Sequence, residues 1–178
     1  MIDIKATTVL AIRKDGKTVM IADGQVTLGQ GVIIKGTAHK LKRLYDGKVL
    51  VGFAGGAGFA MILCEELEKC LNKFSGHLVK SCMEFSKSVR SMPRGNNEDV
   101  MMIVADKDQM LVVSSSGEVL EPEDCVYSVG SGSLYALSAA KALLRNTKMS
   151  AKTIAEEAMK IASETCVYTN TNYTYEEI

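Results

Sequence analysis

Residues 8–21 read TVLAIRKDGKTVMI, and this stretch decides the fold. Two apolar runs rich in β-branched residues, Thr8–Ile12 and Thr18–Ile21, flank the dipeptide Asp15-Gly16. An Asp-Gly pair between two such runs is a strong short-range signal for a tight turn. The stretch therefore predicts a β-hairpin near the start of the chain.

Outward from this hairpin, runs of strands alternate with pairs of helices. Further strand-like runs stand at Gly31–Ile34, Lys48–Ala54, Val100–Ala105, Met110–Ser114, Val126–Val129, Val167–Tyr168 and Tyr173–Ile178, and a polar loop is expected at Arg94–Glu98. Apolar spacing predicts helices over Gly58–Phe74, Leu78–Met92, Leu134–Arg145 and Ala151–Thr165, the last with Ser150 as its N-cap. Helix pairs do not suit a doubly wound sheet, in which helices alternate singly with strands. We expect an α+β fold, a four-layer αββα sandwich of two antiparallel sheets flanked by helix pairs.

The composition is that of an ordinary globular domain. The 178 residues are about the length of one domain. The 21 Lys and Arg residues balance the 21 Asp and Glu residues, so the chain lacks the basic field of a nucleic-acid-binding protein. No apolar run reaches the roughly 18–20 residues of a membrane helix. The five cysteines show no C-x-x-C spacing, which argues against a disulfide framework or a zinc site and favours a reducing compartment.

Two glycine-rich turns each follow a predicted strand and precede a predicted helix. They are GFAGG at residues 52–56 and GSGS at residues 130–133. Such turns aim backbone N–H groups at an anion, which can be a phosphate or an oxyanion. Neither turn continues with the G-K-[ST] of a P-loop, and a tight strand-to-helix turn would explain either one alone. A small nucleotide-binding module therefore stays open as a weak alternative.

Thr7 is a candidate nucleophile that needs no histidine. The only histidines are His39 and His77, so Ser-His-Asp and Cys-His sites have few candidates. If the chain were cut after Ala6, Thr7 would carry a hydroxyl and a free α-amine with a pKa of roughly 7.7–8.0. The amine could then take the hydroxyl proton and act as the base. A lysine would polarise the hydroxyl, and an aspartate would orient that lysine.

At this point the chain resembles the HslV family, the proteasome-related peptidase subunits of two-component ATP-dependent proteases. The matching stretches run in family order over nearly the whole chain, which is more specific than any single motif. They are TTVLAIRKDGKTV at 7–19, ADGQVTLG at 22–29, KRLYDGKVLVGFAGG at 42–56, GHLVK at 76–80, GEVLEPED at 117–124, VGSGSLYALSAAKALL at 129–144 and CVYTN at 166–170.

The resemblance implies an N-terminal-nucleophile hydrolase and assigns its parts. Thr7 would be the nucleophile, Lys40 the catalytic lysine and Asp23 the partner of that lysine. Gly55 would supply an N–H to the oxyanion hole, and Ser131 would form a hydrogen bond near the threonine amine. Residues 1–6 would be a short leader that is removed from a peptidase domain at 7–178.

Further roles are implied for binding residues. Phe53 and Thr27 would contact the substrate. The backbone carbonyls of Ser163, Cys166 and Thr169 would bind a monovalent cation, Na+ or K+, and no organic cofactor is expected.

The same resemblance implies an assembly. The chain would form a double ring of hexamers and would receive unfolded proteins from an HslU-type AAA+ ATPase, which alone uses ATP. Neither nucleic acid nor membrane is expected as a partner. The location would be the bacterial cytoplasm, or the mitochondrial matrix if the source is eukaryotic.

Several positions depart from the family pattern. Ala22 replaces a usual glycine, GSGS replaces the commoner GSGG, and MPRGNN at Met92–Asn97 replaces a basic, leucine-rich stretch. The leader and this altered stretch keep a second hypothesis open, a non-catalytic scaffold subunit of a proteasome-like ring.

Overall fold

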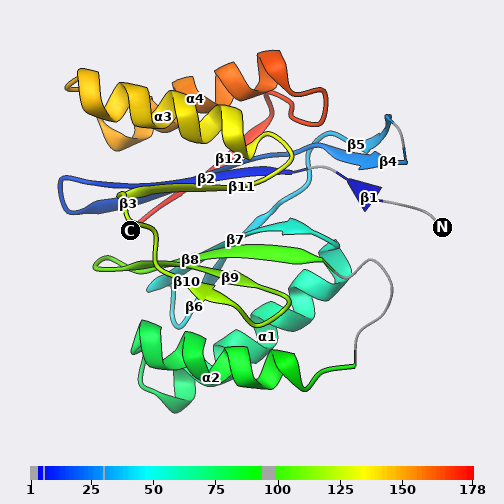
Figure 1. The fold of residues 1–178 in the computed structure, drawn as a ribbon, viewed down its shortest axis with the longest axis vertical. Helices are drawn as coiled ribbons and strands as arrows, with labels where there is room; N and C mark the ends of the chain where they lie inside the picture. The colour runs from blue at the N-terminus through cyan, green and yellow to red at the C-terminus, as the bar shows by residue number, and fades with distance from the viewer. Residues whose placement is uncertain (1–3, 6, 30, 94–98) are drawn as a thin grey trace.

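Two antiparallel β-sheets lie face to face, and a pair of helices covers the outer side of each (Figure 1). The structure is a computed structural model that describes residues 4–5, 7–29, 31–93 and 99–178. The expected four-layer αββα sandwich is therefore confirmed. The polar loop expected at Arg94–Glu98, and most of the expected leader, lie outside the described residues.

The first sheet has the strand order β11-β2-β3-β12 and carries helices α3 and α4. Its strands are β11 (Val126–Gly130), β2 (Thr8–Lys14), β3 (Lys17–Asp23) and β12 (Tyr173–Glu177). Its helices are α3 (Ser133–Asn146) and α4 (Ala151–Thr165). The predicted N-cap of α4 is confirmed, because the Ser150 hydroxyl accepts a hydrogen bond from the Thr153 N–H at 3.2 Å.

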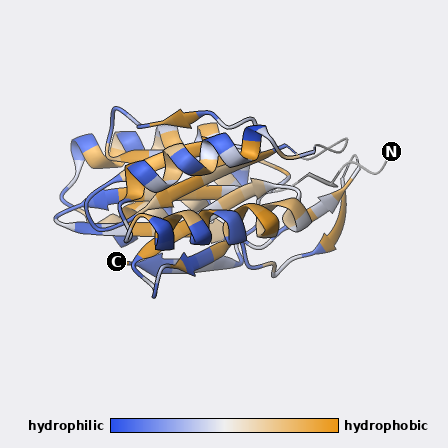
Figure 2. Cartoon of the chain, turned by 90° about the horizontal axis from the view of Figure 1, so that it is seen from below, coloured by the Kyte–Doolittle hydropathy of each residue, from blue (hydrophilic) through white to orange (hydrophobic). Residues whose placement is uncertain are grey.

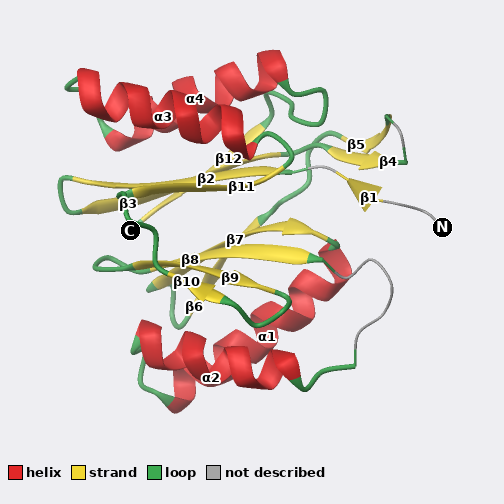
Figure 3. Cartoon of the chain, viewed as in Figure 1, coloured by secondary structure: helices red, strands yellow, loops and turns green. Residues whose placement is uncertain are grey.

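The second sheet has the order β10-β9-β8-β7-β6 and carries helices α1 and α2. Its strands are β10 (Val119–Leu120), β9 (Met110–Ser114), β8 (Val100–Ala105), β7 (Val49–Gly55) and β6 (Leu41–Leu44). Its helices are α1 (Ala57–Lys73) and α2 (Leu78–Arg90). A small third sheet joins β1 (Ile4–Lys5), β4 (Val26–Leu28) and β5 (Val32–Lys35) beside the sandwich (Figure 3).

The opening hairpin forms as the Asp-Gly signal predicts. Strands β2 and β3 pair antiparallel, with Lys14 opposite Lys17. The two turn residues have positive φ angles, 52° at Asp15 and 75° at Gly16. This geometry matches the twist of the flanking strands, which is why Asp-Gly suits the turn.

Strand β2 is buried on both faces, because one face meets helices and the other meets the second sheet. Leu10 and Ile12 belong to the core under α3 and α4, whereas Val9 and Ala11 belong to the core between the sheets. Figure 2 shows the result, with strands that are mostly hydrophobic and helices of mixed hydropathy.

Gly52 on β7 lets the two sheets approach each other. A Cβ atom there would lie 2.5 Å from Val9 Cγ1 and 2.7 Å from Met20 Sδ on the opposite sheet. Because a packed core cannot absorb this contact without moving, we expect Gly52→Ala to lower the free energy of unfolding by about 1–3 kcal/mol. Urea denaturation measures this change. Gly58→Ala in α1 is the control, since nothing lies within 4 Å of its added Cβ and it should not destabilise the protein.

One strand prediction is wrong. Val167–Tyr168 was expected to be strand-like, but these residues form a turn after α4. Val167 is 79% exposed, and its backbone carbonyl accepts a hydrogen bond from Gln25 Nε2 at 2.9 Å. The backbone here is thus held by a side chain from another loop and does not join a sheet. The last strand begins only at Tyr173.

Candidate active site

The candidate site lies where several strand ends meet at one edge of the sandwich. Strand β2 begins at Thr8, next to the ends of its neighbours β3 and β11, because both pair with it antiparallel. Thr8 stands opposite Gly130 in the ladder, and Asp23 is the last residue of β3. The topology therefore brings Thr7, Asp23 and the GSGS turn together, although they are far apart in the sequence.

Asp23 and Lys40 form a buried ion pair. Lys40 Nζ lies 2.8 Å from Asp23 Oδ1, and the two side chains are only 5% and 0% exposed. The ammonium also donates to the Gln25 carbonyl at 2.7 Å. Burial lowers the pKa of Lys40 from its usual value, and the nearby Asp23 carboxylate partly opposes this shift. The pair is the one that the resemblance implies, and the catalytic role of both residues stays a prediction.

The Asp23 carboxylate is held by three backbone N–H groups as well as by Lys40. Oδ1 accepts from the Thr8 N–H at 2.7 Å, while Oδ2 accepts from Gln25 N–H at 3.0 Å and Asn170 N–H at 3.3 Å. Charge-assisted bonds of this kind fix a carboxylate in place. Since Thr8 is one of the donors, the pair is tied directly to the residue that follows Thr7.

Thr7 itself is buried and is held through its backbone. Its carbonyl accepts a hydrogen bond from the Ser131 N–H at 2.8 Å, so the two main chains are in contact. The expected hydrogen bond of Ser131 near the threonine amine stays a prediction. Gly130 has a φ of 99°, and a Cβ on it would lie 2.0 Å from the Thr7 carbonyl oxygen. The turn can therefore pack against Thr7, the residue just before β2, only with glycine at this position.

The side chain of Thr8 also connects the segments that meet at the candidate site. Its hydroxyl lies 2.7 Å from the Thr169 hydroxyl and accepts a hydrogen bond from the Gly132 N–H at 3.0 Å. Thr8 is fully buried. The sequence showed Thr8 only as a strand residue, because its contacts come from elements more than 120 residues further along the chain.

Gly55 ends β7 near the candidate site, with a φ of 121°. A Cβ on it would lie 2.0 Å from the Asp99 carbonyl oxygen, so the backbone conformation and the close contact both require glycine at this position. The residue is exposed, whereas its neighbours on the strand are buried. Its assignment to an oxyanion hole stays a prediction.

The two residues expected to contact the substrate, Phe53 and Thr27, lie close to the Asp23–Lys40 pair in the folded chain. Phe53 is 4% exposed and packs in the core under α1 and α2, while its N–H donates to the Lys40 carbonyl at 3.2 Å. Thr27 is buried on β4, and its hydroxyl accepts from Gln25 Nε2 at 3.1 Å. That both contact a substrate stays a prediction.

The expected cation residues lie in the last turn of α4 and just after it. Ser163 lies within the helix, Cys166 is its C-cap, and the Cys166 carbonyl accepts from the Thr169 N–H at 3.0 Å. Backbone carbonyl oxygens are hard donors that suit an alkali cation, so the donor set fits the expected ion. Within the described ranges, no cluster of His, Cys, Asp or Glu could hold a metal.

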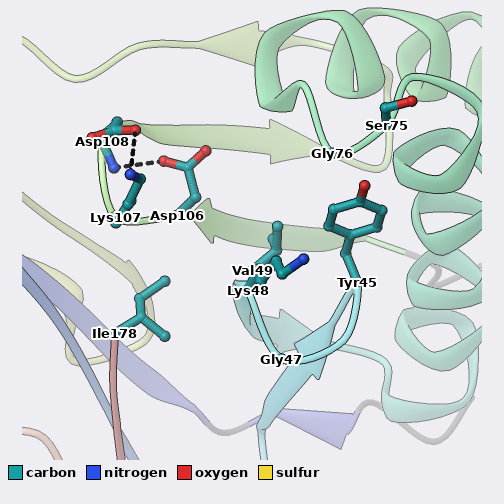
Figure 4. A pocket seen from close by; sticks show the side chains of 10 residues that line it. All are labelled: Tyr45, Gly47, Lys48, Val49, Ser75, Gly76, Asp106, Lys107, Asp108 and Ile178. Carbon is teal, nitrogen blue, oxygen red and sulfur yellow. Dashed lines mark hydrogen bonds and ion pairs between the residues drawn. The ribbon is translucent and has the colours of Figure 1, made fainter.

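A pocket of about 440 Å³ lies at the other end of β7, beside Val49 (Figure 4). Figure 4 shows Tyr45 and Lys48 on one side and Asp106, Lys107 and Asp108 on the other. Strand β7 runs from Val49 to Gly55, a span of roughly 20 Å at about 3.3 Å per residue. The pocket includes no predicted site residue and is separate from the candidate site.

The fold and the site together define a class. A four-layer αββα sandwich, with a threonine ahead of a buried central strand and beside a buried Asp–Lys pair, is the arrangement of an N-terminal-nucleophile hydrolase. Comparison with known proteins identifies the family within this class. The model of the Proteasome family, described as "Proteasome subunit", matches residues 4–178.

Its relatives share nearly the full length. The chain is 53% identical over 175 residues to the ATP-dependent protease subunit HslV of Sulfurihydrogenibium sp. and 50% identical over 175 residues to that of Staphylococcus carnosus, with 98% of each chain covered in both cases. A solved structure of eukaryotic HslV from Trypanosoma brucei superposes with a TM-score of 0.87 at 33% identity, covering 96% of this chain and 98% of the other. The chain therefore belongs to the Proteasome family, and within it to the HslV protease subunits.

A more distant likeness concerns the fold alone. The Thiobacillus denitrificans protein BPH superposes with a TM-score of 0.69 at 22% identity, over 96% of this chain and 97% of that one. In the part of the chain that the structure describes, no helix combines the length and the apolar character of a membrane span.

Proposed function

We propose that this protease subunit is a threonine-type endopeptidase that uses Thr7 as its nucleophile once residues 1–6 are removed. The observation that carries the proposal is the buried Lys40–Asp23 pair, which is bonded to the Thr8 N–H directly after Thr7. A buried charge pair is costly to build, and such a pair beside a candidate nucleophile favours catalysis over a purely structural role.

The mechanism follows from these groups. Cleavage of the Ala6–Thr7 bond frees the α-amine, which takes the proton of the Thr7 hydroxyl as the oxygen attacks the peptide carbonyl. The Lys40 ammonium, held by Asp23 and the Gln25 carbonyl, favours the developing negative charge on that oxygen. The Gly55 N–H stabilises the oxyanion. The C–N bond then breaks, the departing amine takes the proton from the protonated α-amine, and an ester with Thr7 remains, which water hydrolyses.

The partners are proposed from the relatives, which are named as subunits of an ATP-dependent protease. The chain forms a double ring of hexamers with the sites inside, and an HslU-type AAA+ ATPase delivers unfolded protein. The carbonyls of Ser163, Cys166 and Thr169 would hold a Na+ or K+ ion, whose positive charge would stabilise the turn next to the site. The bacterial cytoplasm is the proposed location.

The second candidate, a scaffold subunit, is favoured by one observation. Ile4–Lys5 pairs with β4, so the uncut chain keeps Thr7 internal and buried. A subunit that never lost these residues would have no free amine at Thr7 and no peptidase activity of its own.

The deciding experiment measures the intact mass of the purified protein together with its hydrolysis of a fluorogenic peptide, with and without the ATPase. We expect a mass that begins at Thr7 and hydrolysis that follows that species. A chain that still begins at Met1 after incubation with the ATPase, and that cleaves no peptide, would support the scaffold instead.

A further inference from the structure

We propose that Asn170 is a positioning residue that keeps Lys40 in place against Asp23. The inference rests on the proposed function. Asn170 lies in the segment between α4 and β12, far from both partners in the sequence. It ends the CVYTN stretch at 166–170, and neither the residue pattern nor the resemblance assigns it a role.

Asn170 uses both ends of its side-chain amide. Its Oδ1 accepts a hydrogen bond from the Gly24 N–H at 3.2 Å, and its Nδ2 donates to the Gly36 carbonyl at 2.9 Å. Its own backbone N–H donates to Asp23 Oδ2 at 3.3 Å. One residue thus contacts the carboxylate of the ion pair, the residue directly after Asp23, and the loop that leads to Lys40.

Asn170 joins the loop after Asp23 to the loop before Lys40. These two loops are the base of a segment of the chain that leaves the sandwich and returns to it. Asp23 ends β3, the chain then runs out through β4 and β5, and it returns to Lys40 just before β6. Strand β5 is exposed at all four of its positions, so this segment projects from the core. The relative placement of Asp23 and Lys40 therefore depends on contacts at its base.

At that base, the loop after Asp23 and the loop before Lys40 are in close backbone contact. The Ala38 N–H donates to the Gly24 carbonyl at 2.8 Å, and a Cβ on Gly24 would lie 2.5 Å from the Gly36 carbonyl oxygen. The Asn170 amide bridges Gly24 and Gly36, the two residues in this contact. Because Lys40 follows Gly36 by only four residues, loss of the bridge lets the loop that carries the ammonium shift.

Asn172 supplies a matched control. Its Nδ2 donates to the same Gly36 carbonyl at 2.9 Å, but Asn172 is exposed, and among the described residues its side chain makes no hydrogen bond to Gly24 or Asp23. The two asparagines therefore share one anchor, and only Asn170 also reaches the loop after Asp23.

The test compares Asn170→Ala and Asn172→Ala with the parent protein in peptide hydrolysis. We expect Asn170→Ala to lower kcat by about tenfold to a hundredfold with KM within about twofold, because displacing a catalytic group affects the chemical step more than binding. Asn172→Ala should keep the parent kcat. If Asn170→Ala does not fold, Asn170→Asp replaces it, since an aspartate still accepts from Gly24 but no longer donates to Gly36; its kcat should also fall.

A second readout needs no activity. Amide hydrogen exchange at Gly24, followed by NMR in the full-length chain, should become about tenfold faster or more in Asn170→Ala and stay unchanged in Asn172→Ala. Parent values of kcat and of Gly24 exchange in Asn170→Ala would overturn the inference. A parent protein without peptidase activity would overturn the proposed function, while the exchange rates would still decide whether the bridge holds the loop.

Discussion

Replacing Thr7 by alanine will reduce peptide hydrolysis by about three orders of magnitude or more, because the variant has no oxygen to attack the peptide carbonyl. The α-amine of residue 7 and the Lys40–Asp23 pair remain, but they have no hydroxyl on which to act. The rate of fluorogenic peptide cleavage measures the loss. Preparations whose mass begins at residue 7 must be compared, so that a retained leader does not imitate the effect.

Thr7→Ser is the control for this experiment. Serine keeps an oxygen next to the α-amine, so it should retain measurable hydrolysis that the alanine variant lacks. Both variants should denature at nearly the same urea concentration as the parent, since strand β2 begins at Thr8 and its core residues are unchanged. Hydrolysis by Thr7→Ala at the parent rate would contradict the proposed nucleophile.

Asp23→Ala is expected to have the largest effect on stability. It removes the acceptor of the N–H groups of Thr8, Gln25 and Asn170 in a buried site, and it leaves the Lys40 ammonium with the Gln25 carbonyl but without a counter-charge. Breaking a buried ion pair on one side costs about 3–5 kcal/mol. Urea denaturation should show this fall in the free energy of unfolding, and peptide hydrolysis should be lost as well.

Replacing Lys40, the other member of the buried ion pair, should lower the free energy of unfolding by less than Asp23→Ala does. In Lys40→Met, the Asp23 carboxylate loses its counter-charge but keeps its three backbone donors, so its oxygens remain hydrogen-bonded. An exposed pair of similar length, Arg43 with Glu176 at 2.7 Å, provides the surface reference, and Glu176→Gln should cost under about 1 kcal/mol. If Asp23→Ala were no more destabilising than Glu176→Gln, the buried pair would not have the energetic weight assigned to it.

Elements with strong local signals could be read from the sequence. The hairpin turn at Asp15-Gly16, the N-cap at Ser150 and the apolar faces of the helices each follow from neighbouring residues. Val167–Tyr168 shows where local reading fails, because two β-branched or aromatic residues resemble a strand but are held in a turn by Gln25. Short strands such as β4 and β6 lacked a pattern long enough to be recognised.

The candidate site also contains some residues that could be predicted from the sequence and others that could not. Thr7, Asp23 and Lys40 could be named from residue chemistry and resemblance, and the structure brings Asp23 and Lys40 into one buried pair beside Thr8. Thr8, Gln25 and Asn170 could not be named, since each acts through hydrogen bonds to loops that are distant in the sequence.

Residue type and local pattern predicted the helices and the longer strands, and together with the resemblance they named the side chains that can do the chemistry. Only the packing of the two sheets decided that the ends of β3 and β11 meet the start of β2, and that the loop to Lys40 closes on Gly24. The physical reason is that propensity and periodicity act over a few residues, whereas burial of an ion pair and satisfaction of its hydrogen bonds depend on the whole assembled core.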